Sequence, residues 1–124
     1  MIGAKGPKML RLAARHADIW SWFAEERSDL LELGPRLAAF EAACVDAGRD
    51  PATVGKSAGI VVEPTSISGS EALGTPIRGS AVEIADVLRA FGAAGFTNLE
   101  IIVSPPTLAA VDAIAPVLEL LDAT

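Results

Sequence analysis

The sequence predicts an α/β protein with about four strand–helix units and parallel strands. Two observations carry this prediction: segments of helical periodicity alternate with short β-branched runs, and glycine-containing turns separate the two kinds of segment. Strands that alternate with helices pair in parallel through right-handed crossovers. The length of 124 residues fits one domain, residues 1–124.

The chain opens on a glycine-rich turn that has almost no strand in front of it. Residues 1–2 are the only strand-like residues before Gly3. Pro7 then begins a helix over 7–16, because its fixed φ and missing N–H suit a first turn. The next run, 17–23, is rich in β-formers and predicts a strand.

The second helix is predicted with an interruption. Gly34 and Pro35 break its pattern, and the part that follows carries one apolar stripe that ends at Gly48. A strand over 56–63 comes next. The stripe consists of Leu37, Phe40, Cys44 and Ala47.

The segment 64–79 has the glycine, proline, serine and threonine content of a long loop. Its end is sharply marked, because Ser80 and Glu83 form an S-x-x-E capping box. The helix that follows has apolar residues at i, i+3, i+4 and i+7, and Gly95 ends it.

The last unit combines an apolar strand over 97–103 with a helix that Thr107 begins and Pro116 bends. Two architectures fit this order of elements, an open doubly wound sheet and part of a (β/α) barrel. A whole barrel needs about 250 residues. Length alone therefore favours the open sheet.

Composition excludes several classes of function. A net charge of −6 without a run of basic residues argues against a nucleic-acid partner. One cysteine, Cys44, and one histidine, His16, exclude an intrachain disulfide and a Cys- or His-based metal site. No apolar run approaches about 20 residues and no signal-peptide pattern is present, so we expect a cytoplasmic protein with no membrane partner.

Three stretches in order carry a family resemblance. "IGAKGPKMLRLAARHADIW" resembles a signature of the luciferase-like flavin-dependent oxidoreductases, and "DAGRDPATV" and "RGSAVEIADVLRAFGAAGFTNLEIIVSPPT" are similar to later parts of the same family. The family fold is a (β/α)8 barrel. The resemblance therefore implies a partial, half TIM barrel that corresponds to the C-terminal half and begins near the fifth strand.

In that family the glycine turn binds the phosphate of FMN or of the deazaflavin coenzyme. The resemblance implies that Gly3, Ala4, Lys5 and Gly6 form this cofactor site, although the family often has Gly or Ser at the positions of Ala4 and Lys5. The physical reason is general: glycines let N–H groups approach an anion, and a helix N-terminus adds partial positive charge. The stretch is neither a P-loop nor a G-x-G-x-x-G fingerprint.

Most other chemically active side chains receive structural interpretations. We expect His16 to face unpaired carbonyls at a helix end and Cys44 to lie in the core. Trp20 and Trp22 are interpreted as packing residues. Contact of Trp22 with a ligand is the alternative, because Trp22 is nearer the C-terminal end of the strand, where barrel active sites lie. Three residues are interpreted as solvent-facing: Glu25, Glu26 and Arg78, the last with contact to a cofactor tail as an alternative. No catalytic residue is assigned.

The resemblance favours the C-terminal portion of a flavin- or deazaflavin-dependent oxidoreductase or monooxygenase, without turnover on its own. A half-barrel exposes strand edges and an inner face, including "GIVV" and "LEIIV", so we expect a homo-oligomer or pairing with a complementary half-barrel chain. Two alternatives remain open: a non-catalytic self-associating assembly module, and a small open-sheet domain that binds a phosphorylated metabolite.

Overall fold

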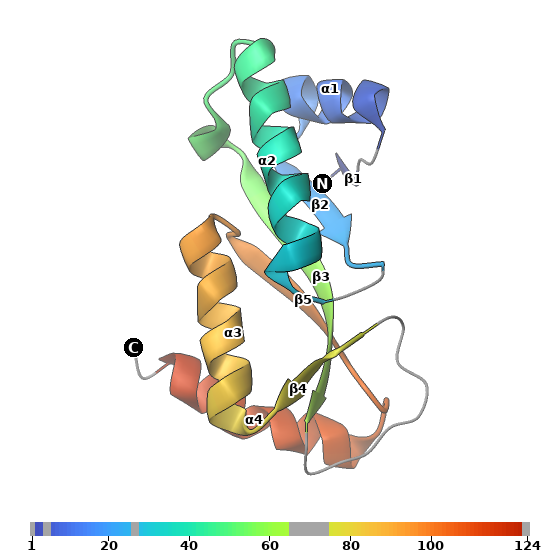
Figure 1. Ribbon diagram of the computed structural model, residues 1–124, viewed down its shortest axis with the longest axis vertical. Coiled ribbons are helices and arrows are strands. Elements are labelled where there is room, and N and C mark those ends of the chain that lie inside the picture. Colours follow the sequence, from blue (N-terminus) through green and yellow to red (C-terminus); the bar gives the residue numbers. More distant parts are fainter. Residues whose placement is uncertain (1, 4–5, 26–27, 65–74, 123–124) are drawn as a thin grey trace.

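The computed structural model describes residues 2–3, 6–25, 28–64 and 75–122. Within them the chain forms a five-stranded parallel sheet with four α-helices and one short 3-10 turn (Figure 1). This confirms the predicted α/β fold of about four strand–helix units. The elements are β1 (Ile2–Gly3), α1 (Pro7–His16), β2 (Ile19–Phe23), α2 (Leu30–Asp46), η1 (Pro51–Thr53), β3 (Gly55–Pro64), β4 (Ile77–Gly79), α3 (Ala81–Ala94), β5 (Asn98–Val103) and α4 (Leu108–Asp122).

Strand β3 is the centre of the sheet. Val62 is aligned with Ile77 of β4 and with Val103 of β5, so these two strands lie on opposite edges of β3. β2 is aligned with residues 55–59 of β3 and shares an edge with β4, and β1 pairs with the outer edge of β2. β5 is therefore an edge strand, bonded to β3 alone among the strands that the structure describes.

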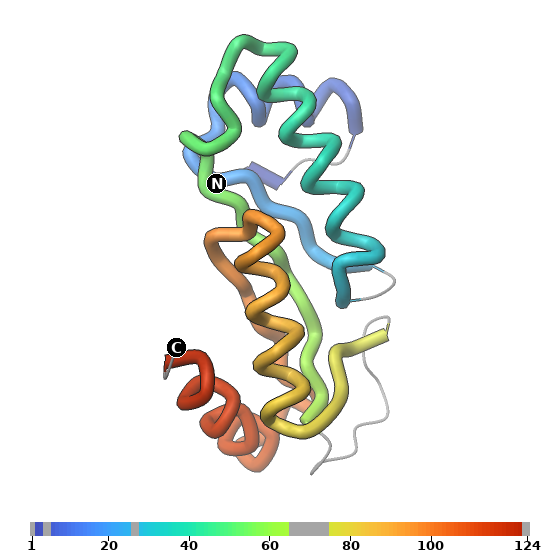
Figure 2. Tube along the Cα trace, turned by 60° about the vertical axis from the view of Figure 1, so that its left-hand side comes forward, coloured from blue at the N-terminus to red at the C-terminus, as the bar shows by residue number. Residues whose placement is uncertain are grey.

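The helices form two pairs at the two ends of an elongated molecule. α1 packs on α2 at one end, and α3 packs on α4 at the other, with β3 running between them (Figures 1 and 2). The largest fully buried side chains, Trp20, Phe40 and Phe91, lie between strands and helices.

The sheet has one face turned to the helices and one face turned away from them. Side chains alternate between the faces along a strand. The helix-facing set includes Trp20, Trp22, Ile60 and Val62, which belong to the core cluster. We call the opposite face the open face; it is formed by Ile19, Ser21 and Phe23 of β2, Ser57, Gly59 and Val61 of β3, and Asn98, Glu100 and Ile102 of β5.

The expectation that "GIVV" exposes apolar side chains is wrong. All four residues, 59–62, are buried: Ile60 and Val62 belong to the core cluster, the Phe23 ring covers Gly59, and Val61 is 1% exposed. The expectation holds for "LEIIV" in part. Exposed and half-buried residues alternate along β5, and the Ile102 side chain on the open face is 42% exposed.

The predicted break at Gly34 and Pro35 is also wrong, since α2 runs through both residues. Proline has no N–H, so a proline inside a helix cannot donate a hydrogen bond to the carbonyl four residues earlier. That carbonyl belongs to Leu31, an exposed residue in the first turn, where water can satisfy it. The Asp29 side chain caps the helix by accepting from the N–H groups of Leu31 and Glu32.

Several predicted helix ends are confirmed. Ser80 and Glu83 form a reciprocal capping box, Gly95 ends α3 with a φ of 120°, and the Thr107 hydroxyl accepts from the N–H of Ala110. The short strand β4 was not predicted, because three residues are too few for a periodic signal. The rest of the predicted loop, residues 65–74, lies outside the described residues.

Candidate functional site

The candidate site is the edge of the sheet where the parallel strands end and the helices begin. In parallel α/β folds ligands bind at this edge, because the loops and helix N-termini converge there. Three features of this edge are described: the turn between β1 and α1, the end of β2, and the ends of β3 and β4.

Among the described residues, no side chain caps the N-terminus of α1, which follows β1. Gly6 is the N-cap of α1, with an extended backbone (φ −81°, ψ 163°), and Pro7 follows it. The first turn holds no acidic residue but does hold the exposed Lys8. The other three described α-helices are each capped by an oxygen of Asp29, Ser80 or Thr107. Within the described residues, the first N–H groups of α1 therefore have no side-chain acceptor, and a helix N-terminus carries partial positive charge.

The two described glycines of this turn have room for a side chain. A Cβ added at Gly6 meets no described atom within 4 Å, and one added at Gly3 would make an ordinary contact with Ser21 O at 3.8 Å. Neither glycine has a positive φ, so the fold itself does not require glycine at these positions. Ala4 and Lys5, the other two predicted cofactor-binding residues, lie outside the described residues.

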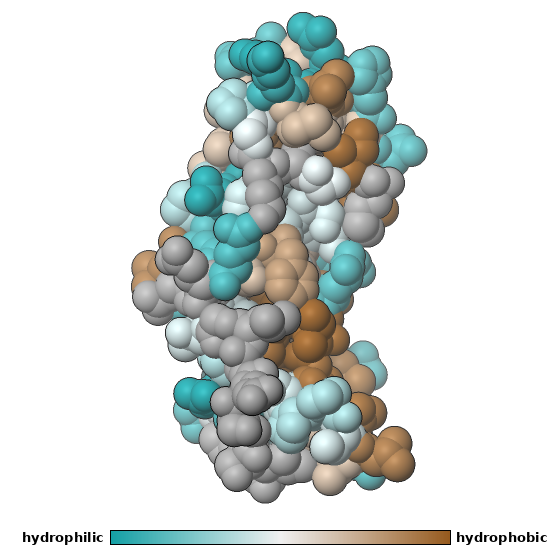
Figure 3. Space-filling view, turned by 90° about the vertical axis from the view of Figure 1, so that its right-hand side faces the viewer, coloured by the Kyte–Doolittle hydropathy of each residue, from teal (hydrophilic) through white to brown (hydrophobic). Residues whose placement is uncertain are grey.

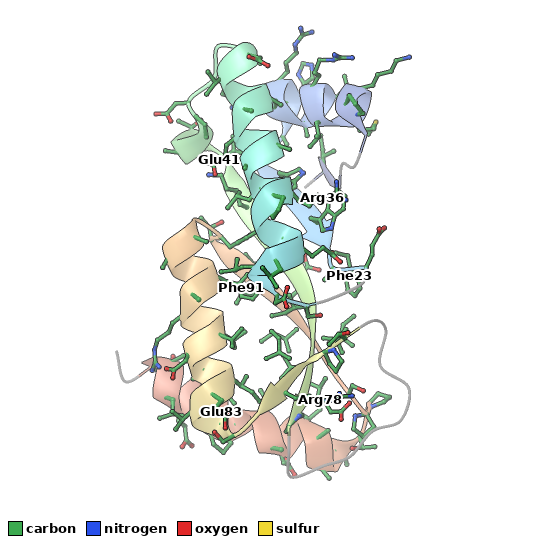
Figure 4. All side chains as sticks on the ribbon, viewed as in Figure 1. Phe23, Arg36, Glu41, Arg78, Glu83 and Phe91 are labelled. Atoms are coloured by element: carbon green, nitrogen blue, oxygen red, sulfur yellow. The ribbon has the colours of Figure 1, made fainter. Side chains whose placement is uncertain are left out.

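The two tryptophans of β2 face the helices. Trp20 stacks on Phe40 of α2 with ring centroids 4.7 Å apart. The guanidinium carbon of Arg36 lies 4.7 Å from the Trp22 ring centroid, and the Trp22 Nε1–H donates to Glu32 at 3.3 Å (Figure 4). Packing is therefore the role of both rings. The alternative that Trp22 contacts a ligand on the open face does not fit this orientation.

The aromatic residue on the open face is Phe23, which sequence reasoning missed. It is the last residue of β2 and is exposed (Figure 4). Its ring covers Gly59 so closely that a Cβ there would overlap Phe23 Cδ2 and lie 3.2 Å from Cγ. A signal was present in the sequence, because the residue after Trp22 must face the opposite way on a strand.

Two side chains bond to the described residues between β2 and α2. The Glu32 carboxylate accepts from the backbone N–H of the exposed Glu25 at 2.9 and 3.2 Å. Ser28 is buried, and its hydroxyl accepts from the N–H of Val61 at 2.8 Å. These bonds attach Glu25 to α2 and Ser28 to β3. Glu26 lies outside the described residues.

An ion pair between an exposed arginine and a buried carboxylate lies where β3 and β4 end. Arg78 Nε donates to Glu63 Oε1 at 3.1 Å, with the Glu63 side chain 8% exposed and the Arg78 side chain 57% exposed (Figure 4). Glu63 Oε2 is buried and has no hydrogen-bond partner among the residues that the structure describes. The interpretation of Arg78 as solvent-facing is thus incomplete, since its guanidinium also neutralises a buried carboxylate.

A polar network crosses the open face between β3 and β5. The buried Ser57 hydroxyl donates to Glu100 Oε1 at 3.1 Å and accepts from Asn98 Nδ2 at the same distance. Both partners are exposed. This part of the open face is therefore hydrophilic.

The single histidine and the single cysteine have the predicted positions. His16 is the exposed last residue of α1, and Cys44 is fully buried on α2. Burial raises the pKa of the Cys44 thiol, so it is protonated at neutral pH. In the described ranges no group of three His, Cys, Asp or Glu residues is arranged to hold a metal ion, and no helix is long and apolar enough to cross a membrane.

Comparisons with known proteins give a consistent answer on the fold. No protein-family model matches the sequence, and no curated protein matches it. Solved structures do match, and they are luciferase-like oxidoreductases with TIM-barrel folds that use F420 or FMN.

Three of these structures show the extent of the match. An F420-dependent secondary alcohol dehydrogenase matches 96% of this chain with a TM-score of 0.66 and 15% identity. A riboflavin lyase with modified FMN matches 98% with a TM-score of 0.71 and 12% identity. A coenzyme F420-dependent tetrahydromethanopterin reductase from Methanopyrus kandleri matches 93% with a TM-score of 0.68 and 15% identity. The chain spans 47%, 42% and 47% of these proteins respectively. It has the fold of part of a luciferase-like barrel.

Proposed function

We propose that this chain is the part of a luciferase-like oxidoreductase that binds the phosphate of FMN or F420, at the turn formed by Gly3, Ala4, Lys5 and Gly6. The observation that carries the proposal is the uncapped N-terminus of α1 at the carboxyl end of β1. Ala4 and Lys5 enter the proposal from the sequence alone.

The described residues of the turn fit a phosphate group. An anion needs N–H donors, positive potential and room for its oxygens. The turn offers uncapped N–H groups, the Lys8 side chain and the open space beside Gly6, and no carboxylate lies in the first turn of α1. When bound, FMN or F420 supplies the electron-transfer chemistry, and the chain binds and orients it.

We further propose that the chain has no appreciable turnover by itself. A barrel active site is assembled from loops around the whole rim, and four strand–helix units supply only part of that rim. A robust FMN- or F420-dependent reaction catalysed by the purified 124-residue chain would contradict this proposal.

The test of the phosphate site is titration of the chain with FMN and with F420, followed by fluorescence. Gly6→Asp is the informative variant. The new carboxylate caps α1 and stabilises the protein by a few tenths of a kcal/mol. It also repels the phosphate, so affinity falls at least tenfold while stability rises.

Gly92→Asp is the matched control. It adds the same charge at an exposed glycine of α3 that also borders open space, so cofactor affinity should not change. Inorganic phosphate should compete with FMN in the wild-type chain. Equal FMN affinity in Gly6→Asp and wild type, or no binding of either cofactor, would refute the proposal.

The free edge of β5 favours one alternative, a self-associating assembly module. Self-association without binding of either cofactor supports that alternative. Binding of an unrelated phosphate ester in place of both cofactors supports the small-domain alternative.

A further inference from the structure

We propose that a second copy of this chain binds along the free edge of β5, antiparallel to it and related by a two-fold axis, so that two sheets become one. This goes beyond the cofactor site, because it names the partner and the surface of the self-association that we expect. An interface with two-fold symmetry uses the same surface on both copies, so the assembly is limited to a dimer.

The first argument is the direction of the backbone groups of β5. Ser104 N–H donates to Val62 O, so the even-numbered residues of this strand point their backbone groups to β3. Backbone groups alternate in direction along a strand. The N–H and C=O groups of Leu99, Ile101 and Val103 therefore point to the free edge and are able to pair with another strand.

The second argument is the apolar surface beside this edge. Ile102 is 42% exposed and Leu108, at the start of α4, is 84% exposed. A cavity of about 490 Å³ lies between residues 101–103, residues 106–108 and Val111. Figure 3 shows hydrophobic side chains gathered in the lower half of the face turned to the viewer. Open edges bordered by apolar surface promote pairing with another chain.

The third argument is that β5 is self-complementary in one register. Directly opposite residues of an antiparallel pair lie on the same face of the sheet. A two-fold axis through Ile101 places Ile101 opposite its own copy and Leu99 opposite Val103, which joins two apolar rows on the helix side. On the open face it places Glu100 opposite Ile102 of the other copy.

The neighbouring registers are less favourable. An axis through Glu100 sets two carboxylates opposite each other, and like charges opposite one another destabilise a sheet. An axis through Ile102 sets Leu99 opposite Pro105, which has no N–H to donate. The register through Ile101 thus avoids like charges and pairs five residues of β5, 99–103, with the same residues of the other copy.

The test is sedimentation of the chain from about 5 to 500 µM, with a pair of variants at one position. Ile102→Glu sets a carboxylate opposite Glu100 of the other copy and should weaken dimerisation at least tenfold. Ile102→Lys removes the same apolar side chain but meets Glu100 with an opposite charge, and its dimerisation should stay within about threefold of wild type. The control is Val45→Glu on α2, at a residue that is 66% exposed and far from β5; it should leave dimerisation unchanged.

Amide hydrogen exchange gives a second readout of the same surface. Between low and high concentration, the amides of Leu99, Ile101 and Val103 should become protected. A monomer at every concentration, protection at β1 in place of β5, or equal weakening by Ile102→Glu and Ile102→Lys would overturn the proposal. Gly6→Asp should dimerise like wild type, so failure of the cofactor site and failure of this dimer are separate outcomes.

Discussion

Gly59→Ala is expected to destabilise the protein because Phe23 occupies the space that a methyl group needs. Phe23 and Gly59 are directly aligned in the β2–β3 pair, and the ring lies on the open face. The alanine Cβ would overlap Cδ2 of the ring and lie 3.2 Å from Cε2 and Cγ. Three ring atoms are involved, so the ring has to turn away from β3.

The magnitude follows from two opposing effects. Forcing an extra methyl group into a packed site costs about 1–3 kcal/mol. Alanine is otherwise better than glycine inside a strand by about 0.5–1 kcal/mol. Gly59→Ala should therefore lower the free energy of unfolding by about 1–2 kcal/mol in the wild-type chain, and raise it by about 0.5 kcal/mol in a Phe23→Ala background.

The assay is urea unfolding of the wild type, both single variants and the double variant, at low micromolar concentration so that association does not contribute. The expected coupling energy is about 2 kcal/mol. Gly92→Ala is the control, because it lies in open space on α3 and should stabilise by about 1 kcal/mol. An equal effect of Gly59→Ala with and without Phe23 would refute the reasoning.

Three further outcomes are expected. Ser80→Ala removes one half of the capping box on α3 and should lower the free energy of unfolding by about 1 kcal/mol, measured by urea unfolding. Arg78→Gln leaves the buried Glu63 carboxylate without its donor and should cost about 1–3 kcal/mol, most of which Glu63→Gln in the same chain should restore. Burial raises the pKa of the Cys44 thiol in the folded protein above its value in the unfolded chain, which is about 8.5. The free energy of unfolding should therefore not depend on this thiol below about pH 8.5, and should decrease as the pH rises from there towards the folded pKa. Alkaline unfolding curves should show this fall in the wild type and lack it in Cys44→Ala.

The sequence predicted the elements that carry a strong local signal. The capping box at Ser80 and Glu83 and the glycine at 95 mark both ends of α3, because capping involves only residues next to each other in the chain. The prediction of a helix break at Pro35 was wrong. The local preference against proline inside a helix was outweighed by the packing of Leu33, Leu37 and Phe40 in the core. Sequence reasoning also missed β4, which forms only because β3 extends beyond β2 and leaves an edge to pair with.

The turn between β1 and α1 was predictable from the sequence, and the contacts at the ends of the other strands were much less so. Glycines before a helix are visible in any sequence, and the structure describes Gly3 and Gly6 at that turn. The pairing of Glu63 with Arg78 joins residues 15 positions apart, across two strands. The bond between Ser28 and Val61 joins residues 33 positions apart. No local pattern encodes such contacts, so sequence reasoning did not find them.

The sequence by itself determined the alternation of strands and helices, the parallel sheet that this alternation requires, and a helix that begins at Pro7 behind a glycine turn, because each depends on near neighbours and side-chain periodicity. Only the tertiary structure decided which face of β2 carries the tryptophans and which carries Phe23, that β3 is central, and that β5 pairs with β3 alone among the described strands. Those facts depend on which distant strands pair and which face the helices cover, and both are settled by burying apolar surface over the whole chain.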